Sequence, residues 1–167
     1  MAKRTRRAHE PAGTPALLAV ERAGVDHRLH EHATDVHAEG EIGPESARQL
    51  GVSPDRVFKT LVADCGGRLV VAVVPVSHHL DLKALARAMG AKKAQMADPA
   101  VAERSSGYVV GGISPLGQRT TLPTVVDDSA LDHETIFVSA GKRSLKLEIA
   151  PADLVELCAA VVAPIRT

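Results

Sequence analysis

The segment that decides the fold reads VFKTLVADCGGRLVVAVVPV and spans residues 57–76. Two β-type runs, 57–64 and 69–76, are separated by the turn Cys65-Gly66-Gly67. Runs of this kind joined by a short glycine turn are typical of an antiparallel hairpin. Because the second run is almost continuously apolar, we expect the hairpin to form the centre of a sheet.

Signals for helices and further strands surround this hairpin. Capping residues, prolines in the first turn and glycines after the last turn predict helices at 15–23, 45–50, 82–89, 99–105 and from 151 onward. Short β-type runs predict strands at 25–32, 108–110, 124–126, 135–139 and 144–149. Helices and strands mix irregularly, so we expect a mixed α/β (α+β) fold with a largely antiparallel sheet and flanking helices.

The composition favours a single domain. A chain of 167 residues with 45% hydrophobic side chains can bury one core. We place the domain at 14–160, between a basic tail at 1–13 and a C-terminal tail at 161–167. The basic tail is expected to be solvated, and a weak contact with RNA is the alternative.

Charge and residue content exclude several classes of protein. Twenty Lys and Arg balance twenty Asp and Glu, which removes the broad positive field of a protein that binds nucleic acid tightly by itself. The aromatic residues are Phe58, Tyr108 and Phe137, too few for a row of base-stacking rings. Cys65 and Cys158 form no CxxC pair, and no apolar run approaches the roughly 18 residues of a membrane helix. We therefore expect a cytoplasmic protein with only local RNA contacts.

Lys59 is a candidate functional residue. It lies between Phe58 and Thr60 in a strand whose other members are mostly apolar, where a strongly hydrated ammonium group is costly. Either an anionic group meets Lys59, or the strand lies at a sheet edge and the lysine stem covers apolar neighbours while its charge reaches water. The residue pattern alone leaves both alternatives open.

Two loops are further candidates. The loop GGISPLG at 111–117 can bring backbone N–H groups close to a phosphate or a developing oxyanion. Its spacing is not that of a P-loop or a dinucleotide-binding motif, and a plain wide turn is the alternative. The loop SAGKRS at 139–144 joins two predicted strands and carries two adjacent cations, with a solvated hairpin tip as its alternative.

Metal and triad chemistry find little support in the sequence. Four histidines fall close together, namely His27, His30, His32 and His37. They have no further ligand at a spacing typical of zinc sites. No GxSxG motif exists, and Ser114 precedes a proline inside a loop. We therefore expect neither a metal nor a cofactor.

An ordered set of segments resembles the YbaK family of aminoacyl-tRNA deacylases, which are related to the editing domain of prolyl-tRNA synthetases. The segments are TPA at 14–16, VFKTL at 57–61, VVPV at 73–76, LDLK at 80–83, GAKK at 90–93, MADP at 96–99, SGY at 106–108, GGISPLGQ at 111–118 and SAGKR at 139–143. They cover nearly all of the chain. The resemblance implies a curved, barrel-like mixed sheet flanked by helices, and an enzyme that removes a mischarged amino acid, characteristically cysteine on proline tRNA.

The resemblance also implies roles for individual residues. Lys59 stands at the family's essential lysine and would hold the phosphate of the terminal adenosine, with the Thr60 hydroxyl beside it. The N–H groups of Gly112 and Ile113 would stabilise the oxyanion of the ester. Further substrate contacts are expected from His32, Phe58, Thr60, Gly111, Ser114, Ser139, Gly141 and Lys146. Contacts with RNA are expected from Lys92, Lys93, Lys142 and Arg143.

The nucleophile implied by the resemblance is the thiol of the substrate, which attacks its own ester and leaves a cyclic thioester. Serine would be rejected because a hydroxyl is a much poorer nucleophile. The expected partners are the misacylated tRNA 3′ end and prolyl-tRNA synthetase, because docking on the synthetase would raise the effective concentration of a factor without a large basic face. Cys-tRNA(Cys) is a second expected substrate.

Three positions depart from the family pattern. His32 replaces a tyrosine that lines the pocket, Ser144 replaces a glycine, and Lys146 replaces an aspartate. If Lys146 faces the site, recognition of a substrate ammonium is in question; strand alternation groups Lys146 with Ser144 and Glu148 on a polar face and allows either orientation. Two rival functions therefore remain: a deacylase for another amino acid, such as that of Ala-tRNA(Pro), and a noncatalytic module that binds an aminoacyl or nucleotide end.

Overall fold

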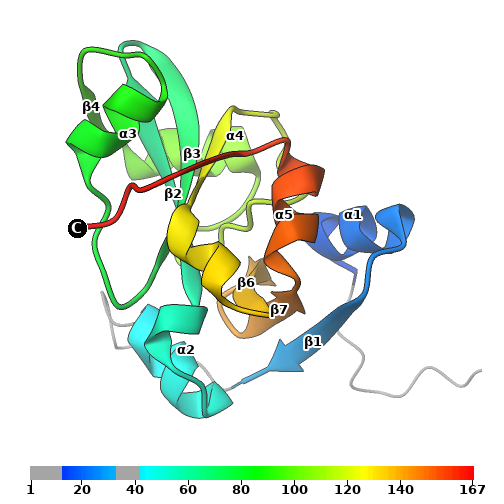
Figure 1. The fold of residues 1–167 in the computed structure, drawn as a ribbon. Coiled ribbons are helices and arrows are strands. Elements are labelled where there is room, and N and C mark those ends of the chain that lie inside the picture. The colour runs from blue at the N-terminus through cyan, green and yellow to red at the C-terminus, as the bar shows by residue number, and fades with distance from the viewer. Residues whose placement is uncertain (1–12, 33–41) are drawn as a thin grey trace, which may run out of the picture.

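The computed structural model describes residues 13–32 and 42–167, and its helices lie around the outside of two β-sheets (Figure 1). The helices are α1 (Pro15–Ala23), α2 (Ile42–Leu50), α3 (Leu82–Ala88), α4 (Pro99–Ser106) and α5 (Pro151–Cys158). The strands are β1 (His27–Glu31), β2 (Phe58–Cys65), β3 (Arg68–Pro75), β4 (Ala94–Met96), β5 (Thr124–Asp127), β6 (Ile136–Lys142), β7 (Leu145–Ile149) and β8 (Val161–Ala163). Two short 3-10 helices cover Pro54–Arg56 and Asp128–Asp132.

The predicted hairpin forms the centre of the larger sheet, whose order is β4-β2-β3-β5-β8. Strands β2 and β3 pair antiparallel over their full length, with Lys59 opposite Val74. Strand β2 also pairs antiparallel with β4, whereas the β3–β5 and β5–β8 pairs are parallel. The smaller sheet, β1-β7-β6, is antiparallel throughout. The prediction of a mixed, largely antiparallel arrangement is therefore confirmed.

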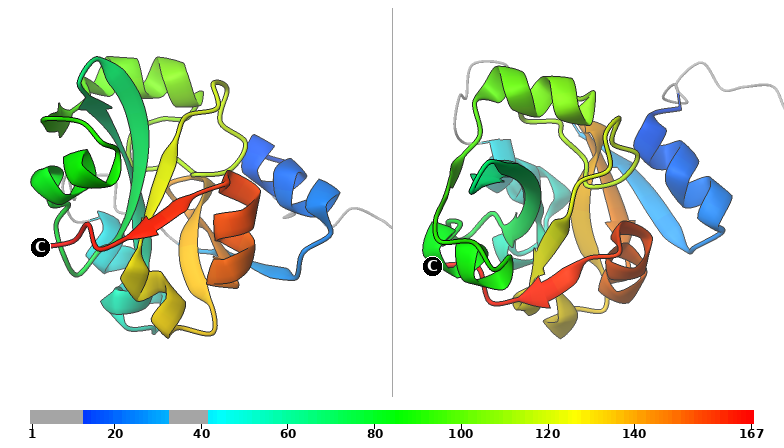
Figure 2. Two further views of the ribbon diagram at one scale, coloured as in Figure 1. Left: turned by 45° about the horizontal axis from the view of Figure 1, so that its top comes forward. Right: turned by 90° about the horizontal axis from the view of Figure 1, so that it is seen from above.

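The two sheets meet at the start of β2, where Val57 bridges Phe137 of β6. Figure 2 shows that β2 and β3 bend strongly, so that the two ends of this hairpin lie in different parts of the molecule. Helix α1 is fastened at its N-cap: the Thr14 hydroxyl accepts from the Leu17 N–H and donates to the Ala140 carbonyl of β6. Aliphatic side chains such as Val73 and Leu147 fill the main core between the elements.

The predicted strand at 108–110 is wrong. Gly107 ends α4 in the left-handed region, at φ 80°, and Gly111 adopts φ 92°, so the chain turns before it can extend. The Tyr108 hydroxyl donates a 2.7 Å hydrogen bond to the Leu116 carbonyl and folds the segment into an irregular loop. This loop therefore belongs to no sheet, and it reaches the site described below.

The segment at 161–167, expected as a tail, is part of the fold. Strand β8 pairs with β5, and the side chain of Ile165 is fully buried. The buried carboxylate of Asp127 accepts hydrogen bonds from the N–H groups of Ile165 and Arg166, at 2.9 and 3.1 Å. Strand β8 has only three residues, which is too short for a strong local sequence signal. The expected tail at 1–13 lies almost entirely outside the described residues.

Among the described residues, no helix is long and apolar enough to cross a membrane.

Candidate functional site

A cavity of about 470 Å³ lies where the start of β2 meets the smaller sheet. Its lining contains two lysines, Lys59 and Lys146, together with the hydroxyl-bearing residues Thr60 and Ser139. The rest of the lining is mainly apolar or glycine: Gly43, Pro44, Val57, Phe58, Leu61, Val62, Val76, His79, Met96, Ala97, Pro99, Ala102, Val110, Gly111 and Ile113. An apolar cavity with a few converging polar groups is the usual form of a small-molecule site.

Lys59 sits near the start of β2 and is partly buried. Burial lowers its pKa from the usual lysine value. Its ammonium group forms no hydrogen bond or ion pair with any residue in 13–32 or 42–167. Beside it, the Thr60 hydroxyl is buried and has no hydrogen-bond partner within the same residues. The Lys59 ammonium is thus available to a ligand and favours an anionic one, whereas the Thr60 hydroxyl is unpaired among the described residues but shielded from solvent.

Lys146 faces the cavity, which settles the orientation that strand alternation left open. It lies in the middle of β7, between His30 of β1 and Ser139 of β6 in register, and its side chain is only 5% exposed. Burial lowers the pKa of Lys146 to about 8. Its ammonium, like that of Lys59, has no partner in the described part of the chain.

The glycine loop is fastened to the β6–β7 hairpin. The Ser139 hydroxyl donates to the Gly112 carbonyl at 2.8 Å, and the Arg143 guanidinium donates to the Val110 carbonyl at 3.0 Å through Nε and 2.8 Å through Nη2. A Cβ on Gly112 would lie 3.0 Å from the backbone nitrogen of Arg143. Glycine at this position therefore permits a close backbone approach.

The expected oxyanion role of Gly112 is not supported by the geometry. Its N–H donates a 2.8 Å hydrogen bond to the Val109 carbonyl and closes a turn, so it is already used within the loop. Ile113 remains a suitable donor, because it lines the cavity and its N–H makes no hydrogen bond with the described residues. The tight turn formed by the glycines uses the Gly112 N–H and leaves the Ile113 N–H unpaired among the described residues.

Three other expected contact residues do not line the cavity. Ser114 is fully buried inside the loop, where its hydroxyl accepts from the Leu116 N–H at 3.2 Å. Gly141 lies in the irregular part of β6 at φ 106°, against Tyr108 and Thr14. His32 follows β1, and its N–H donates to the Ser144 carbonyl at 2.9 Å. Phe58, Gly111, Thr60 and Ser139 do line the cavity, as expected.

Several lining residues were not expected from the sequence. His79 is exposed and contributes to the cavity rim, although a histidine between a strand and a helix cap reads as an ordinary surface residue. Met96 belongs to β4, a three-residue strand without a clear sequence signal. Only the pairing of β4 with β2 brings it to the cavity.

Among the described residues, the cavity lining carries two lysines and no Asp or Glu, so these residues present positive charge to a ligand. Neither cysteine offers a nucleophile: burial raises the pKa of the Cys65 thiol, and it raises that of Cys158 to about 12. Within the described residues, no three His, Cys, Asp or Glu side chains form a group that would hold a metal. His27 and His30 contact Val25 and Glu148 instead, and His37 lies outside the described residues.

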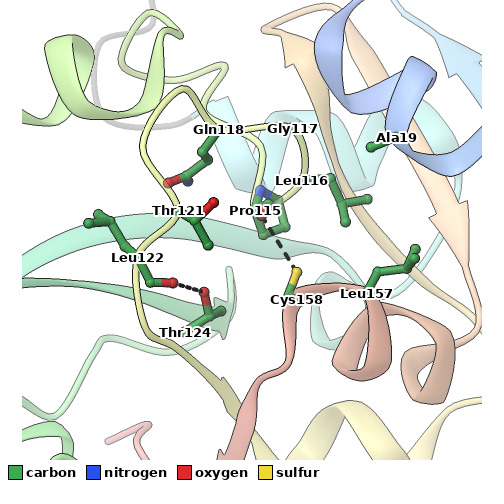
Figure 3. Close-up of a pocket in the computed structure, with 10 residues that line it drawn as sticks. All are labelled: Ala19, Pro115, Leu116, Gly117, Gln118, Thr121, Leu122, Thr124, Leu157 and Cys158. Atoms are coloured by element: carbon green, nitrogen blue, oxygen red, sulfur yellow. Dashed lines mark hydrogen bonds between the residues drawn. The ribbon is translucent and has the colours of Figure 1, made fainter.

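A smaller cavity of about 170 Å³ lies on the other side of the loop (Figure 3). Leu116, Gly117 and Gln118 line it, together with Leu157 and Cys158 at the end of α5. The Cys158 thiol donates to the Pro115 carbonyl at 3.5 Å. The loop thus lines the main cavity with Val110, Gly111 and Ile113, and it lines the smaller cavity beside α5 with residues 115–118.

Comparisons with known proteins agree with this architecture. Residues 41–157 match the model of the aminoacyl-tRNA editing domain. The Enterococcus faecalis protein EbsC, named as a candidate Cys-tRNA(Pro)/Cys-tRNA(Cys) deacylase, is 39% identical over 157 residues, which cover 92% of this chain and 93% of EbsC. A Moorella thermoacetica proline–tRNA ligase is 34% identical over 68 residues, or 41% of this chain and 12% of the ligase.

The fold is also that of a solved structure. The crystal structure of a candidate trans-editing enzyme for prolyl-tRNA synthetase superposes with a TM-score of 0.82 at 23% identity, covering 96% of this chain and 99% of that one. The family match spans more than half of the chain, and EbsC is related over nearly its whole length. The expected family is confirmed: the chain belongs to the aminoacyl-tRNA editing domain family.

Proposed function

We propose that this protein is a trans-editing deacylase that removes cysteine from mischarged tRNA(Pro), with Cys-tRNA(Cys) as a second substrate. One observation carries the proposal: the cavity holds two ammonium groups without partners in the described residues, beside a glycine loop, and its lining offers no cysteine. This arrangement suits an anionic RNA end and a substrate that brings its own nucleophile. The name given to EbsC supports the choice of cysteine.

Lys59 and Thr60 hold the terminal phosphate of the tRNA in this proposal. A phosphate offers several acceptor oxygens, and an ammonium group binds it as a point charge. The hydroxyl of Thr60, buried and without a partner among described residues, supplies a second donor. The Ile113 N–H then faces the carbonyl oxygen of the ester and stabilises its developing charge.

The amino acid is selected by its chemistry as well as its size. The thiol of cysteine attacks the carbonyl carbon of its own ester, and a cyclic thioester and free tRNA result. Serine has nearly the same shape, but its hydroxyl is far less nucleophilic, so positioning alone does not cleave it. The apolar lining provided by Val62, Ala102 and Ile113 excludes water that would hydrolyse other esters.

Two pairs of exposed cations can supply the remaining RNA contacts. Lys92 and Lys93 precede β4, whose Met96 lines the cavity, and Arg143 follows Lys142 and binds the loop at Val110. Four cations give only modest affinity for tRNA. Docking on prolyl-tRNA synthetase would raise the effective concentration of the deacylase at the tRNA 3′ end. This partner is part of the proposal, and so is a cytoplasmic location.

Deacylation of charged tRNA tests the function. We expect deacylation of Cys-tRNA(Pro) and little deacylation of Ser-tRNA(Pro) or Ala-tRNA(Pro), with loss of activity in Lys59→Ala. Lys83→Ala is the matched control, because Lys83 is an exposed lysine on α3 outside the cavity lining. Hydrolysis of Ala-tRNA(Pro) alone would replace cysteine as the substrate. Tight binding of these tRNAs without turnover would identify a binding module.

A further inference from the structure

We propose that Lys146 is the acid–base residue of this reaction: its amine takes the proton of the substrate thiol and later returns it to the leaving ribose oxygen. The inference rests on the proposed cysteine deacylation. It adds the protein group that moves the proton of the substrate thiol. Its starting point is geometric, because Lys146 is a buried lysine whose side chain lines the same cavity as Lys59.

The surroundings of Lys146 leave its amine free for this task. On its own strand, the carboxylate of Glu148 is engaged elsewhere: one oxygen lies 2.9 Å from His30 Nε2, and the other accepts from the Thr135 hydroxyl at 2.6 Å. Arg56 approaches the same carboxylate at 3.8 Å. Glu148 thus has its own set of partners, and no ion pair with a residue in 13–32 or 42–167 fixes the charge of Lys146.

The remaining neighbours of Lys146 are cationic or neutral. On β6, the Ser139 hydroxyl donates to the Gly112 carbonyl of the loop and accepts from the Gly141 N–H of its own strand. Lys59 and His79 also line the cavity. On β1, His30 lies opposite Lys146 in register, and His32 follows the end of that strand. No lining carboxylate in the described residues stabilises the charged form, so burial favours the neutral amine.

Lys59 and Lys146 differ in burial, and this difference suits them to different roles. Lys59 is partly exposed and its charge suits a phosphate, whereas the side chain of Lys146 is 5% exposed. The pKa of about 8 for Lys146 lies near that of a thiol, so proton transfer between them is nearly balanced in energy. Paired titratable groups with different environments commonly take different roles in one site.

The step conserves atoms and charge. The neutral Lys146 amine accepts the thiol proton, and the sulfur lone pair forms a bond to the ester carbonyl carbon. When the carbonyl re-forms, the bond from that carbon to the ribose oxygen breaks. The ribose oxygen takes the proton back from the Lys146 ammonium, which leaves a cyclic thioester, free tRNA and a neutral amine ready for another cycle.

The test is single-turnover deacylation of Cys-tRNA(Pro) between pH 6 and 8.5, with the rate constant and the half-saturating enzyme concentration measured separately. For the unmodified protein we expect a rate that rises with pH and levels off near the upper end. Lys146→Met and Lys146→Arg should each lower the rate constant at pH 7 by about 10²- to 10⁴-fold, the usual contribution of an acid–base group. Lys146→Arg should change the half-saturating concentration less than threefold.

Lys146→Arg distinguishes proton transfer from a fixed positive charge, because a guanidinium keeps its charge and cannot accept a proton at these pH values. A rate within threefold of the unmodified protein in Lys146→Arg overturns the inference, and so does a rate that is independent of pH. A comparable loss in His79→Gln, with Lys146→Arg active, would assign the proton to His79 instead. If the unmodified protein does not cleave Cys-tRNA(Pro), the proposed function itself fails.

Discussion

The hydroxyl of Ser139 donates a 2.8 Å hydrogen bond to the carbonyl of Gly112, and this bond connects the strand beside Lys146 to the glycine loop, whose Gly111 and Ile113 line the cavity. The same hydroxyl accepts from the Gly141 N–H at 3.1 Å. One buried serine therefore sets the position of the loop relative to the β6–β7 hairpin.

Ser139→Ala should loosen the loop. The buried Gly112 carbonyl loses its donor, which we expect to lower the free energy of unfolding by about 1–2 kcal/mol, and the displaced Ile113 N–H should reduce the deacylation rate by roughly tenfold or more. Thermal unfolding and single-turnover kinetics measure the two effects. Ser105→Ala is the matched control, because the Ser105 hydroxyl is buried without a partner among the described residues. Equal effects in both variants would contradict the role of Ser139.

Gly112→Ala should impair activity more than its small size suggests. Its Cβ would lie 3.0 Å from the Arg143 nitrogen and 3.1 Å from the Lys142 carbonyl carbon, and both are backbone atoms that cannot rotate away. The loop must therefore shift away from the hairpin, and we expect a loss of at least tenfold in kcat/KM. Gly13→Ala, where a Cβ makes only an ordinary 3.9 Å contact, should retain activity. An unaffected Gly112→Ala would show that the loop position is not critical.

Lys146→Met should stabilise the protein at neutral pH although it lowers the rate of deacylation. In the folded chain, burial lowers the pKa of Lys146 to about 8 from the usual lysine value of 10.5. Below pH 8 the buried charge therefore costs free energy, of order 3 kcal/mol at about 1.4 kcal/mol per pKa unit. Between pH 8 and 10.5 the unfolded chain binds more protons than the folded one, so the stability of the unmodified protein rises with pH from this group.

Urea unfolding at pH 7 and pH 10 measures this difference. We expect the advantage of Lys146→Met to be large at pH 7 and to shrink at pH 10, because the lysine is then neutral in the folded protein. Lys83→Met, at an exposed lysine on α3, should show no such dependence. An advantage of equal size at both pH values would mean that the variant gains from packing and not from the removed charge.

Asp127→Ala should destabilise the fold without changing the reaction. The fully buried carboxylate accepts from the N–H groups of Ile165, Arg166 and Ser129, and from the Ser129 hydroxyl. Its removal leaves several buried donors unpaired, so we expect a loss of about 3 kcal/mol or more. Denaturant unfolding measures the loss, and the single-turnover rate at a temperature where the variant is folded should stay within threefold. A strongly reduced rate would link the C-terminal segment to the site.

The sequence predicted most elements because their signals are local. The hairpin at 57–76 and the proline- and glycine-bounded helices depend on turn residues and caps that lie within a few positions of each element. The strands β4 and β8 were missed because each has three residues and is held by its neighbour in the sheet. The expected strand at 108–110 failed because two glycines with positive φ turn the chain at its ends.

The sequence by itself determined the family, the central hairpin and the placement of Lys59 in an apolar strand, since these follow from residue order and spacing. Only the tertiary structure decided that Lys146 faces the cavity and that the Gly112 N–H is occupied by Val109. Alternation along β7 gives two possible faces, and the face that is covered depends on how the smaller sheet packs against the start of β2. That packing buries Lys146 beside residues that are far away in the chain, such as Lys59 and Ile113, which line the same cavity.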